Sequence, residues 1–340
     1  MHIEEESVDD LLNRVYSSLL NGSNDQRLVN TSKGNTAERI GALLRLRNPR
    51  ARLSASEMRL KLISALGEFI WYVAGSDDPA FIQHYIDWYK NVRLDSGRVP
   101  GAYGPRLFGA PPYDQISKVV NILKQRPNSR RAVVQLYRAD DLALSLGATS
   151  TSDLFEVPCT CTLQFLNRGG TLLLVVYMRS NDAYKGLPHD VFCFTMLQEV
   201  VARAVGVELG CYVHCVGSLH LYEDDWALAK AYLEEGWHSV TPMPDMPPGD
   251  QMSAIGRVVA AERAIRTGQG SVMTDALAPY WRDMVLLLQA HSALGGAPHE
   301  SRSRILQETR NQVSCEGYKR YLLDRENALE RERADMEPRK

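Results

Sequence analysis

The chain has 340 residues, 44% of them hydrophobic, which is enough apolar material to bury a large core. The formal net charge is only −2, so neither a nucleic acid nor an anionic membrane is expected as a partner. No apolar run reaches the roughly eighteen residues of a membrane span, and the opening MHIEEESVDD is acidic, so the predicted location is the cytoplasm.

Helical periodicity dominates the first part of the chain. It predicts an amphipathic helix over 8–19, where apolar residues recur at helical spacing. A second helix is predicted before Gly75, with Ser54 or Ser56 as its N-cap and an apolar stripe from Leu62 onward. A third is predicted over 113–125.

Alternating and β-branched residues follow from position 131. They predict a strand over 131–137, then a hairpin whose strands, 161–167 and 171–178, flank the turn RGG. A mostly apolar helix over 189–205 and a strand over 211–222 come next, and helical periodicity dominates the remainder. This order predicts an α+β fold in which helices pack a mixed β-sheet, and the absence of a linker favours one domain over residues 1–340.

The segment PCTCTLQF places Cys159 directly after Pro158, at the start of a predicted strand. A cysteine in an apolar segment is often just a small buried hydrophobe. Cys161 shares its strand face, so the pair could also grip a metal, but no second Cys or His pair with zinc-site spacing accompanies it. No metal site is therefore expected, and the six cysteines are expected to be free thiols.

Two basic clusters accompany this cysteine. The segment YMRSNDAYKGLPHD joins Arg179 to Ser180, and NSRR contains Arg130 and Arg131. A guanidinium is a planar fork of donors that suits phosphate, and a serine adds a hydroxyl. Either cluster alone is typical of surface salt bridges, but together with the cysteine they predict an anion site.

The motifs resemble those of the thymidylate synthases and their hydroxymethylase relatives, from about residue 57 to 225. The spacing agrees as well, since 20, 31 and 61 positions separate Cys159 from Arg179, Asp190 and His220. The resemblance implies a thymidylate synthase-like fold that forms a homodimer through its sheet, with a divergent helical region from about residue 242. Its landmarks are GEFIWYVAGS, AYG, NSRR, PCTCTLQF, YMRSNDAYKGLPHD and GSLHLYEDD.

The resemblance also implies roles for individual residues. Cys159 would be the nucleophile that adds to C6 of a pyrimidine nucleoside monophosphate. Arg179 and Ser180 would hold the phosphate, and Arg130 with Arg131 would reach it from the other subunit of the homodimer.

The remaining roles concern proton transfer, sugar and folate. Glu68 would organise the proton-transfer water with support from Tyr103, and the donor would be 5,10-methylenetetrahydrofolate. His220 and Tyr222 would contact the sugar, and Gln164 would bind the substrate. Lys33 is the nearest candidate for an N-terminal phosphate ligand. Asp182, Gly186 and Trp88 would lie at the folate.

Elementary chemistry agrees with these roles. C5 of a pyrimidine is a poor nucleophile, but thiolate addition at C6 turns the C5–C6 bond into an enolate or enamine that can attack an electrophilic methylene. A thiol ionises more easily than a hydroxyl, and nearby arginines favour the thiolate further. A carboxylate such as Glu68 is then needed to shuttle protons.

Asp190 bears on which base is bound. The synthases resembled carry asparagine there, whose amide pairs with N3–H and O4 of uracil. Cytosine presents an acceptor at N3 and an amino donor at C4, so it matches a protonated carboxyl, or a carboxylate facing a ring protonated at N3. A helix-capping role for this aspartate is the structural alternative.

Further departures affect what happens after one-carbon transfer. Thr160 replaces a histidine, His189 a phenylalanine and Lys185 a leucine, and the chain ends ADMEPRK rather than in a short apolar tail. If water reaches the exocyclic methylene before hydride does, the product is the 5-hydroxymethyl nucleotide and the folate leaves as tetrahydrofolate. The favoured function is 5-hydroxymethylation of CMP or dCMP. The alternatives are an atypical synthase that methylates dUMP or UMP, and a catalytically silent nucleotide-binding protein on the same fold.

Overall fold

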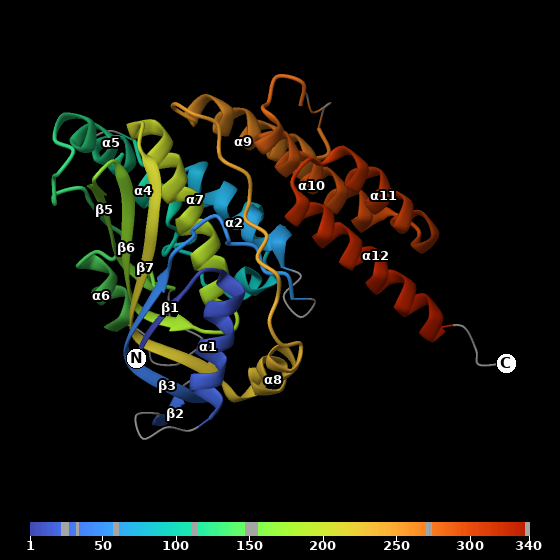
Figure 1. The fold of residues 1–340 in the computed structure, drawn as a ribbon, viewed down its shortest axis with the longest axis horizontal. Helices are drawn as coiled ribbons and strands as arrows, with labels where there is room; N and C mark the ends of the chain where they lie inside the picture. The colour runs from blue at the N-terminus through green and yellow to red at the C-terminus, as the bar shows by residue number, and fades with distance from the viewer. Residues whose placement is uncertain are drawn as a thin grey trace.

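A mixed β-sheet forms the centre of the molecule (Figure 1). The computed structural model describes residues 1–21, 27–31, 34–56, 61–110, 114–146, 156–269, 272 and 274–336. Within these residues seven strands lie in the order β1-β3-β7-β6-β5-β4, with β2 beside β3. The strands are β1 (His2–Glu5), β2 (Arg27–Thr31), β3 (Gly34–Leu46), β4 (Val133–Gln135), β5 (Thr160–Arg168), β6 (Thr171–Asp182) and β7 (Glu208–Tyr222).

Parallel and antiparallel pairs coexist in this sheet. β6 runs parallel to β7 and β1 runs parallel to β3, whereas the other neighbours are antiparallel. The predicted hairpin is confirmed as β5 and β6, which meet at Gly169 and Gly170, both with positive φ. The α+β prediction with a mixed sheet is therefore confirmed.

Helices pack against the sheet and against one another. The long ones are α1 (Val8–Leu20), α2 (Leu62–Val73), α5 (Gln115–Gln125) and α7 (Leu187–Val205), and the short ones are α3 (Pro79–Gln83), η2 (Asp87–Asn91), α4 (Gly104–Leu107) and α6 (Asp140–Leu146). α7 is buried along most of its length, because its residues are apolar nearly all round. Its position against β6 and β7 places it directly behind the strands that carry the predicted site.

One local prediction is wrong, and three strands were not predicted. Neither Ser54 nor Ser56 caps α2, whose N-cap is Lys61 without a side-chain hydrogen bond; the Ser54 hydroxyl instead donates to Asp9. The sequence also gave no sign of β1, β2 and β3. In β3 the buried positions change parity at Gly41, where φ is +65°, from Ala37 and Arg39 to Ala42 and Leu44, so no single alternation marks the strand.

The parity change in β3 continues across the sheet. Gly41 of β3 and Gly217 of β7 face each other without being paired, and Arg179 of β6 is likewise left out of the pairing with β7. In β5 the extra residue of a bulge is Cys161. At Gly217 a Cβ atom would lie 2.9 Å from the Arg179 carbonyl oxygen, so the glycine permits this close approach. Such irregularities change the direction in which side chains point, and this row of irregular positions includes Arg179 and lies next to Cys159.

One face of the sheet is partly apolar and exposed. Ile40, Leu43, Val133 and Tyr177 alternate with buried neighbours along β3, β4 and β6, and each is between 37% and 55% exposed.

The end of the chain is helical, as predicted. After η4 (Glu223–Asp225) come α8 (Trp226–Glu234), α9 (Met252–Thr267), α10 (Pro279–Gly296), α11 (His299–Gln312) and α12 (Glu316–Met336), the last four at the far side of α2 (Figure 1). The Tyr85 hydroxyl donates to buried Glu262 of α9 at 2.9 Å. Gly67 makes this contact possible, because a Cβ there would lie 2.2 Å from the Tyr85 ring. No helix in the described ranges is long and apolar enough to cross a membrane.

Candidate active site

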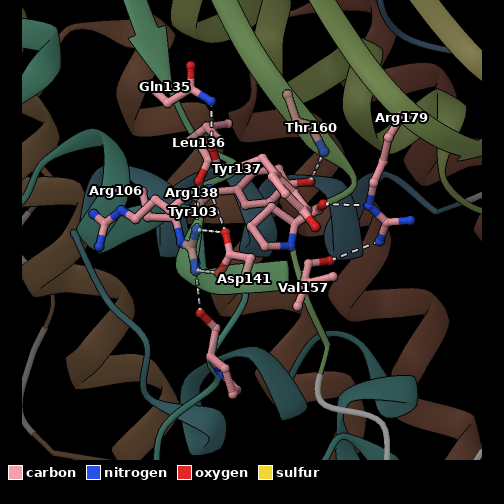
Figure 2. Close-up of polar contacts among 12 residues, drawn as sticks. Tyr103, Arg106, Gln135, Leu136, Tyr137, Arg138, Asp141, Val157, Thr160 and Arg179 are labelled. Atoms are coloured by element: carbon pink, nitrogen blue, oxygen red, sulfur yellow. Dashed lines mark hydrogen bonds and ion pairs between the residues drawn. The ribbon is translucent and has the colours of Figure 1, made fainter. Parts of the chain in front are cut away.

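Cys159 lies half-buried immediately before β5, with the guanidinium of Arg179 beside it. Arg179 Nε donates to the Pro158 carbonyl at 3.0 Å, and Nη2 donates to the Val157 carbonyl at 3.3 Å (Figure 2). Nη2 also lies 3.7 Å from Cys159 Sγ. The hairpin thus fixes a permanent cation against the thiol, and a cation at this position stabilises a thiolate.

Tyr103 contacts the backbone next to the nucleophile. Its hydroxyl accepts the Thr160 backbone N–H at 3.1 Å, and its ring stacks on Phe194 of α7 (Figure 2). Burial raises the pKa of Tyr103 well above its usual value, and the charges of Cys159 and Asp190 raise it further. The phenol therefore stays protonated within electrostatic range of both groups.

Two carboxyl groups, Glu68 and Asp190, lie within electrostatic range of each other. Glu68 of α2 is 9% exposed and accepts the Tyr72 hydroxyl at 2.8 Å. Burial raises the pKa of Glu68 to about 7, although this hydrogen bond opposes the shift. Burial, and next the negative charge of Glu68, raise the pKa of half-buried Asp190 well above its usual range. These surroundings favour the neutral form of Asp190, and Glu68 is poised between its two forms near neutral pH.

Asp182 and Tyr222 close another side of the site. Asp182 Oδ1 accepts the backbone N–H groups of Tyr184 at 2.8 Å and Lys185 at 2.9 Å. The pKa of Tyr222 is raised by burial and then by the charge of Asp182, with a smaller contribution from Cys159. The His220 ring meets the Tyr222 ring edge-on at 5.1 Å. Tyr222 of β7 therefore lies within electrostatic range of both Asp182 and Cys159.

Other predicted residues lie elsewhere. Arg130 and Arg131 are exposed just before β4, and the Arg130 carbonyl accepts Gln164 Nε2 at 3.0 Å. Gln164 therefore supports the backbone that carries the arginines. Ser180 lies at the parity change of β6 and is half-buried. Lys33 lies outside the described residues.

A family model described as thymidylate synthase matches residues 10–251. The chain belongs to the thymidylate synthase family. Membership makes it a one-carbon transferase that binds a nucleotide and a folate, with methylenetetrahydrofolate as the family's donor. The matched segment contains the entire sheet from β2 onward, together with α2 and α7, and ends just before α9.

The residues expected at the folate fit such a ligand. Trp88 is 46% exposed, and its ring meets Tyr89 edge-on at 5.1 Å, so part of this aromatic side chain is accessible to a ligand. Asp182 uses only Oδ1 for its backbone contacts, which leaves Oδ2 to accept N–H groups of a heterocycle. The backbone at Gly186 lies close to the Asn181 side chain, because a Cβ at this position would lie 2.9 Å from Asn181 Nδ2.

Sequence reasoning missed the polar groups that support this site. Arg106 makes a buried double ion pair with Asp141, at 2.6 and 2.8 Å, and also donates to the Leu136 and Pro100 carbonyls (Figure 2). Asn181, Tyr212 and His214 form a second buried group that reaches Asp190. The signal for this second group was polar residues at strand positions whose buried neighbours are apolar.

Proposed function

We propose that this family member is a hydroxymethyltransferase that converts CMP or dCMP to the 5-hydroxymethyl nucleotide through a covalent adduct of Cys159. The observation that carries the proposal is the environment of Asp190, which favours a neutral carboxyl at the position expected to face the base. A neutral carboxyl can donate to N3 of cytosine and accept from its 4-amino group.

The proposed chemistry uses the groups around the thiol. The Cys159 thiolate forms a bond to C6, and C5 then attacks the one-carbon unit, which methylenetetrahydrofolate supplies at the methylene level. Glu68, with a pKa of about 7, is suited to organising the water that carries protons, because it can both accept and release one near neutral pH. Loss of the C5 proton and cleavage of the bond between the one-carbon unit and the folate nitrogen would release tetrahydrofolate and leave an exocyclic methylene. Addition of water to this carbon and cleavage of the S–C6 bond, which frees the Cys159 thiolate, complete the reaction.

Polar groups near the folate side favour water rather than hydride as the final reactant. Lys185 makes an ion pair of 2.8 Å with Asp225, and His189 Nε2 lies 2.8 Å from the Ser64 hydroxyl. Both positions are apolar in the synthases that the chain resembles. Hydrophilic side chains keep water close to a site, whereas apolar ones help to exclude it.

We also propose a homodimer in which Arg130 and Arg131 bind the phosphate of the partner's site. Pairing of Val133 with Gln164 places Arg131 opposite Leu166, seven residues from Cys159 along β5. That is roughly 23 Å at about 3.3 Å per residue, so these arginines are remote from the thiol of their own chain. The exposed apolar side chains of the open sheet face provide a surface on which two sheets can pack.

The test is an assay of CMP, dCMP, UMP and dUMP with methylenetetrahydrofolate, with mass analysis of each product. We expect one hydroxymethyl group on a cytosine nucleotide and no dihydrofolate absorbance. Cys159→Ala serves as the inactive control. Methylation of a uracil nucleotide with release of dihydrofolate would instead identify an atypical synthase, and nucleotide binding without any product would identify a silent binding protein.

Asp190→Asn tests base recognition directly. The amide restores the donor and acceptor pattern that suits uracil, so we expect the preference to move from cytosine to uracil nucleotides. An unchanged ratio of kcat/KM values for the two bases would show that another group recognises the base.

A further inference from the structure

A chain of buried hydrogen bonds ends on Asp190. The Tyr212 hydroxyl lies 2.6 Å from His214 Nδ1, and His214 Nε2 lies 3.0 Å from Asn181 Oδ1. Asn181 Nδ2 then donates to Asp190 Oδ2 at 2.8 Å. Tyr212 and His214 are each 1% exposed and Asn181 is 3% exposed, so water does not substitute for any of these contacts.

The donors in this chain point toward Asp190. Burial lowers the pKa of His214 to about 3, so the ring is neutral and has one donor and one acceptor nitrogen. Asn181 Oδ1 only accepts, which makes His214 Nε2 the donor and Nδ1 the acceptor of the Tyr212 hydroxyl. The opposite direction would leave the Tyr212 O–H without an acceptor in the part of the chain that the structure describes, and buried donors are rarely left unpaired.

The direction matters because a neutral carboxyl is ambiguous. Either oxygen can hold its proton, so a free carboxyl can pair with cytosine in one arrangement and with uracil in the other. Asn181 donates to Oδ2, which makes Oδ2 an acceptor and leaves Oδ1 as the oxygen that holds the proton. Gly186 permits this contact, since a Cβ there would lie 2.9 Å from Asn181 Nδ2 and 3.5 Å from Asp190 Oδ2.

We propose that Tyr212, His214 and Asn181 are positioning residues that keep the proton of Asp190 on Oδ1 and thereby make the site selective for cytosine over uracil. The proposal rests on the proposed function, because it assumes that Asp190 faces the base with Oδ1 toward N3 and Oδ2 toward the 4-position. It adds that selectivity depends on the direction of a hydrogen-bond chain, and that the carboxyl alone does not provide it.

Among the described residues, the titratable groups whose charges interact with that of Asp190 are acids. They are Glu68 of α2, Tyr89 of η2, Tyr103 just before α4, Asp182 of β6, Tyr212 of β7 and Cys193 of α7 itself. Loss of the Asp190 proton therefore places a second negative charge beside Glu68. The alkaline limb of kcat/KM for a cytosine nucleotide is expected to report this loss.

Tyr212→Phe tests the direction of the chain. Without the hydroxyl, His214 can adopt either tautomer and the Asn181 amide can turn, so the Asp190 proton can move to Oδ2. We expect the ratio of kcat/KM for CMP over UMP to fall about tenfold, the effect of losing roughly one hydrogen bond. The alkaline limb should move to higher pH, because the turned amide accepts from the neutral carboxyl and stabilises it.

Two further variants make the result interpretable. Tyr232→Phe is the matched control, because it removes another buried hydroxyl, which donates to Asp9 at 2.7 Å, and should change neither readout. Gly186→Ala displaces the Asn181 amide without altering Tyr212 and should also lower the ratio. Melting temperatures identify variants that fail to fold.

The outcomes separate this proposal from the proposed function. A wild-type enzyme that modifies uracil overturns the proposed function. A cytosine-selective enzyme whose ratio and alkaline limb are unchanged in both Tyr212→Phe and Gly186→Ala overturns the positioning chain alone. A limb that moves to lower pH also overturns it, because that shift indicates water entry rather than a reversed amide.

Discussion

Buried carboxyl groups occur in two kinds of surroundings in this protein. Two in the supporting structure are paired with arginine: Asp141 with Arg106, and Glu199 with Arg52, and the side chains of the second pair have no exposed surface. In the site, Glu68 and Asp190 accept only neutral donors, from Tyr72 and Asn181. Hydrogen bonds from Arg106 lower the pKa of Asp141 despite its burial, whereas the pKa of Glu68 rises to about 7.

The difference shows how one fold gives the same chemical group two uses. A carboxylate beside a guanidinium stays charged and holds segments together. A carboxyl that is buried without a cation keeps its proton, at a cost to stability, and becomes available for proton transfer and for donating a hydrogen bond. Three predictions test this distinction.

The largest expected effect is on catalysis. Glu68→Gln removes the proton-transferring carboxyl, so kcat/KM should fall by about two to four orders of magnitude. The inflection near pH 7 in the pH profile of the wild type should disappear with it, since its pKa is about 7. Glu68→Asp should retain an inflection and part of the activity. A Gln variant with the wild-type profile would mean that another group titrates.

A smaller effect concerns the paired carboxylates. Arg106→Met leaves Asp141 buried without its cation, which should lower the free energy of unfolding by about 3–5 kcal/mol in urea denaturation. Arg98→Met is the matched control, because its ion pair with Asp77 is solvent-exposed and should be worth less than about 1 kcal/mol. Equal losses in the two variants would contradict the role assigned to burial.

The smallest effect is a gain in stability. Glu68 has its pKa raised from 4.5 to about 7 in the folded protein, so its contribution to stability is present below pH 4.5 and is lost as the pH rises through 7. At pH 8 the wild type therefore carries the whole cost of the buried charge. Glu68→Gln should be more stable than the wild type by about 1–3 kcal/mol at pH 8 and by less at pH 5.

The control for this gain is Glu330→Gln, which replaces an exposed carboxyl on α12. It should show no difference between pH 5 and pH 8 relative to the wild type in the same urea denaturation experiment. If Glu68→Gln were equally neutral at both values, Glu68 would not carry a buried charge at high pH.

Local patterns were predictable, and long-range ones were not. The β5–β6 hairpin and helix α7 follow from alternation and from a continuous apolar run, which are properties of neighbouring residues. β3 escaped detection because Gly41 shifts its alternation and because charged Arg39 is on the buried side, where it donates to the Ser18 carbonyl. That partner lies on α1, and no local pattern indicates it.

The candidate site divides in the same way. Motif resemblance named Cys159, Arg179, Glu68 and Asp190, and the hairpin register then brings Arg179 to Cys159, because Thr160 pairs with Met178. Tyr212 and His214 had no predicted role, because their partner Asn181 belongs to a different strand.

The sequence by itself determined which chemical groups are present: a cysteine within reach of an arginine across a hairpin, and an aspartate where the related synthases have asparagine. Only the tertiary structure decided their protonation states. The pKa of a carboxyl depends on how much water is excluded and on which charges approach it, and for Asp190 these come from α2, β6 and β7. Such distances arise when remote segments pack, so no reading of neighbouring residues supplies them.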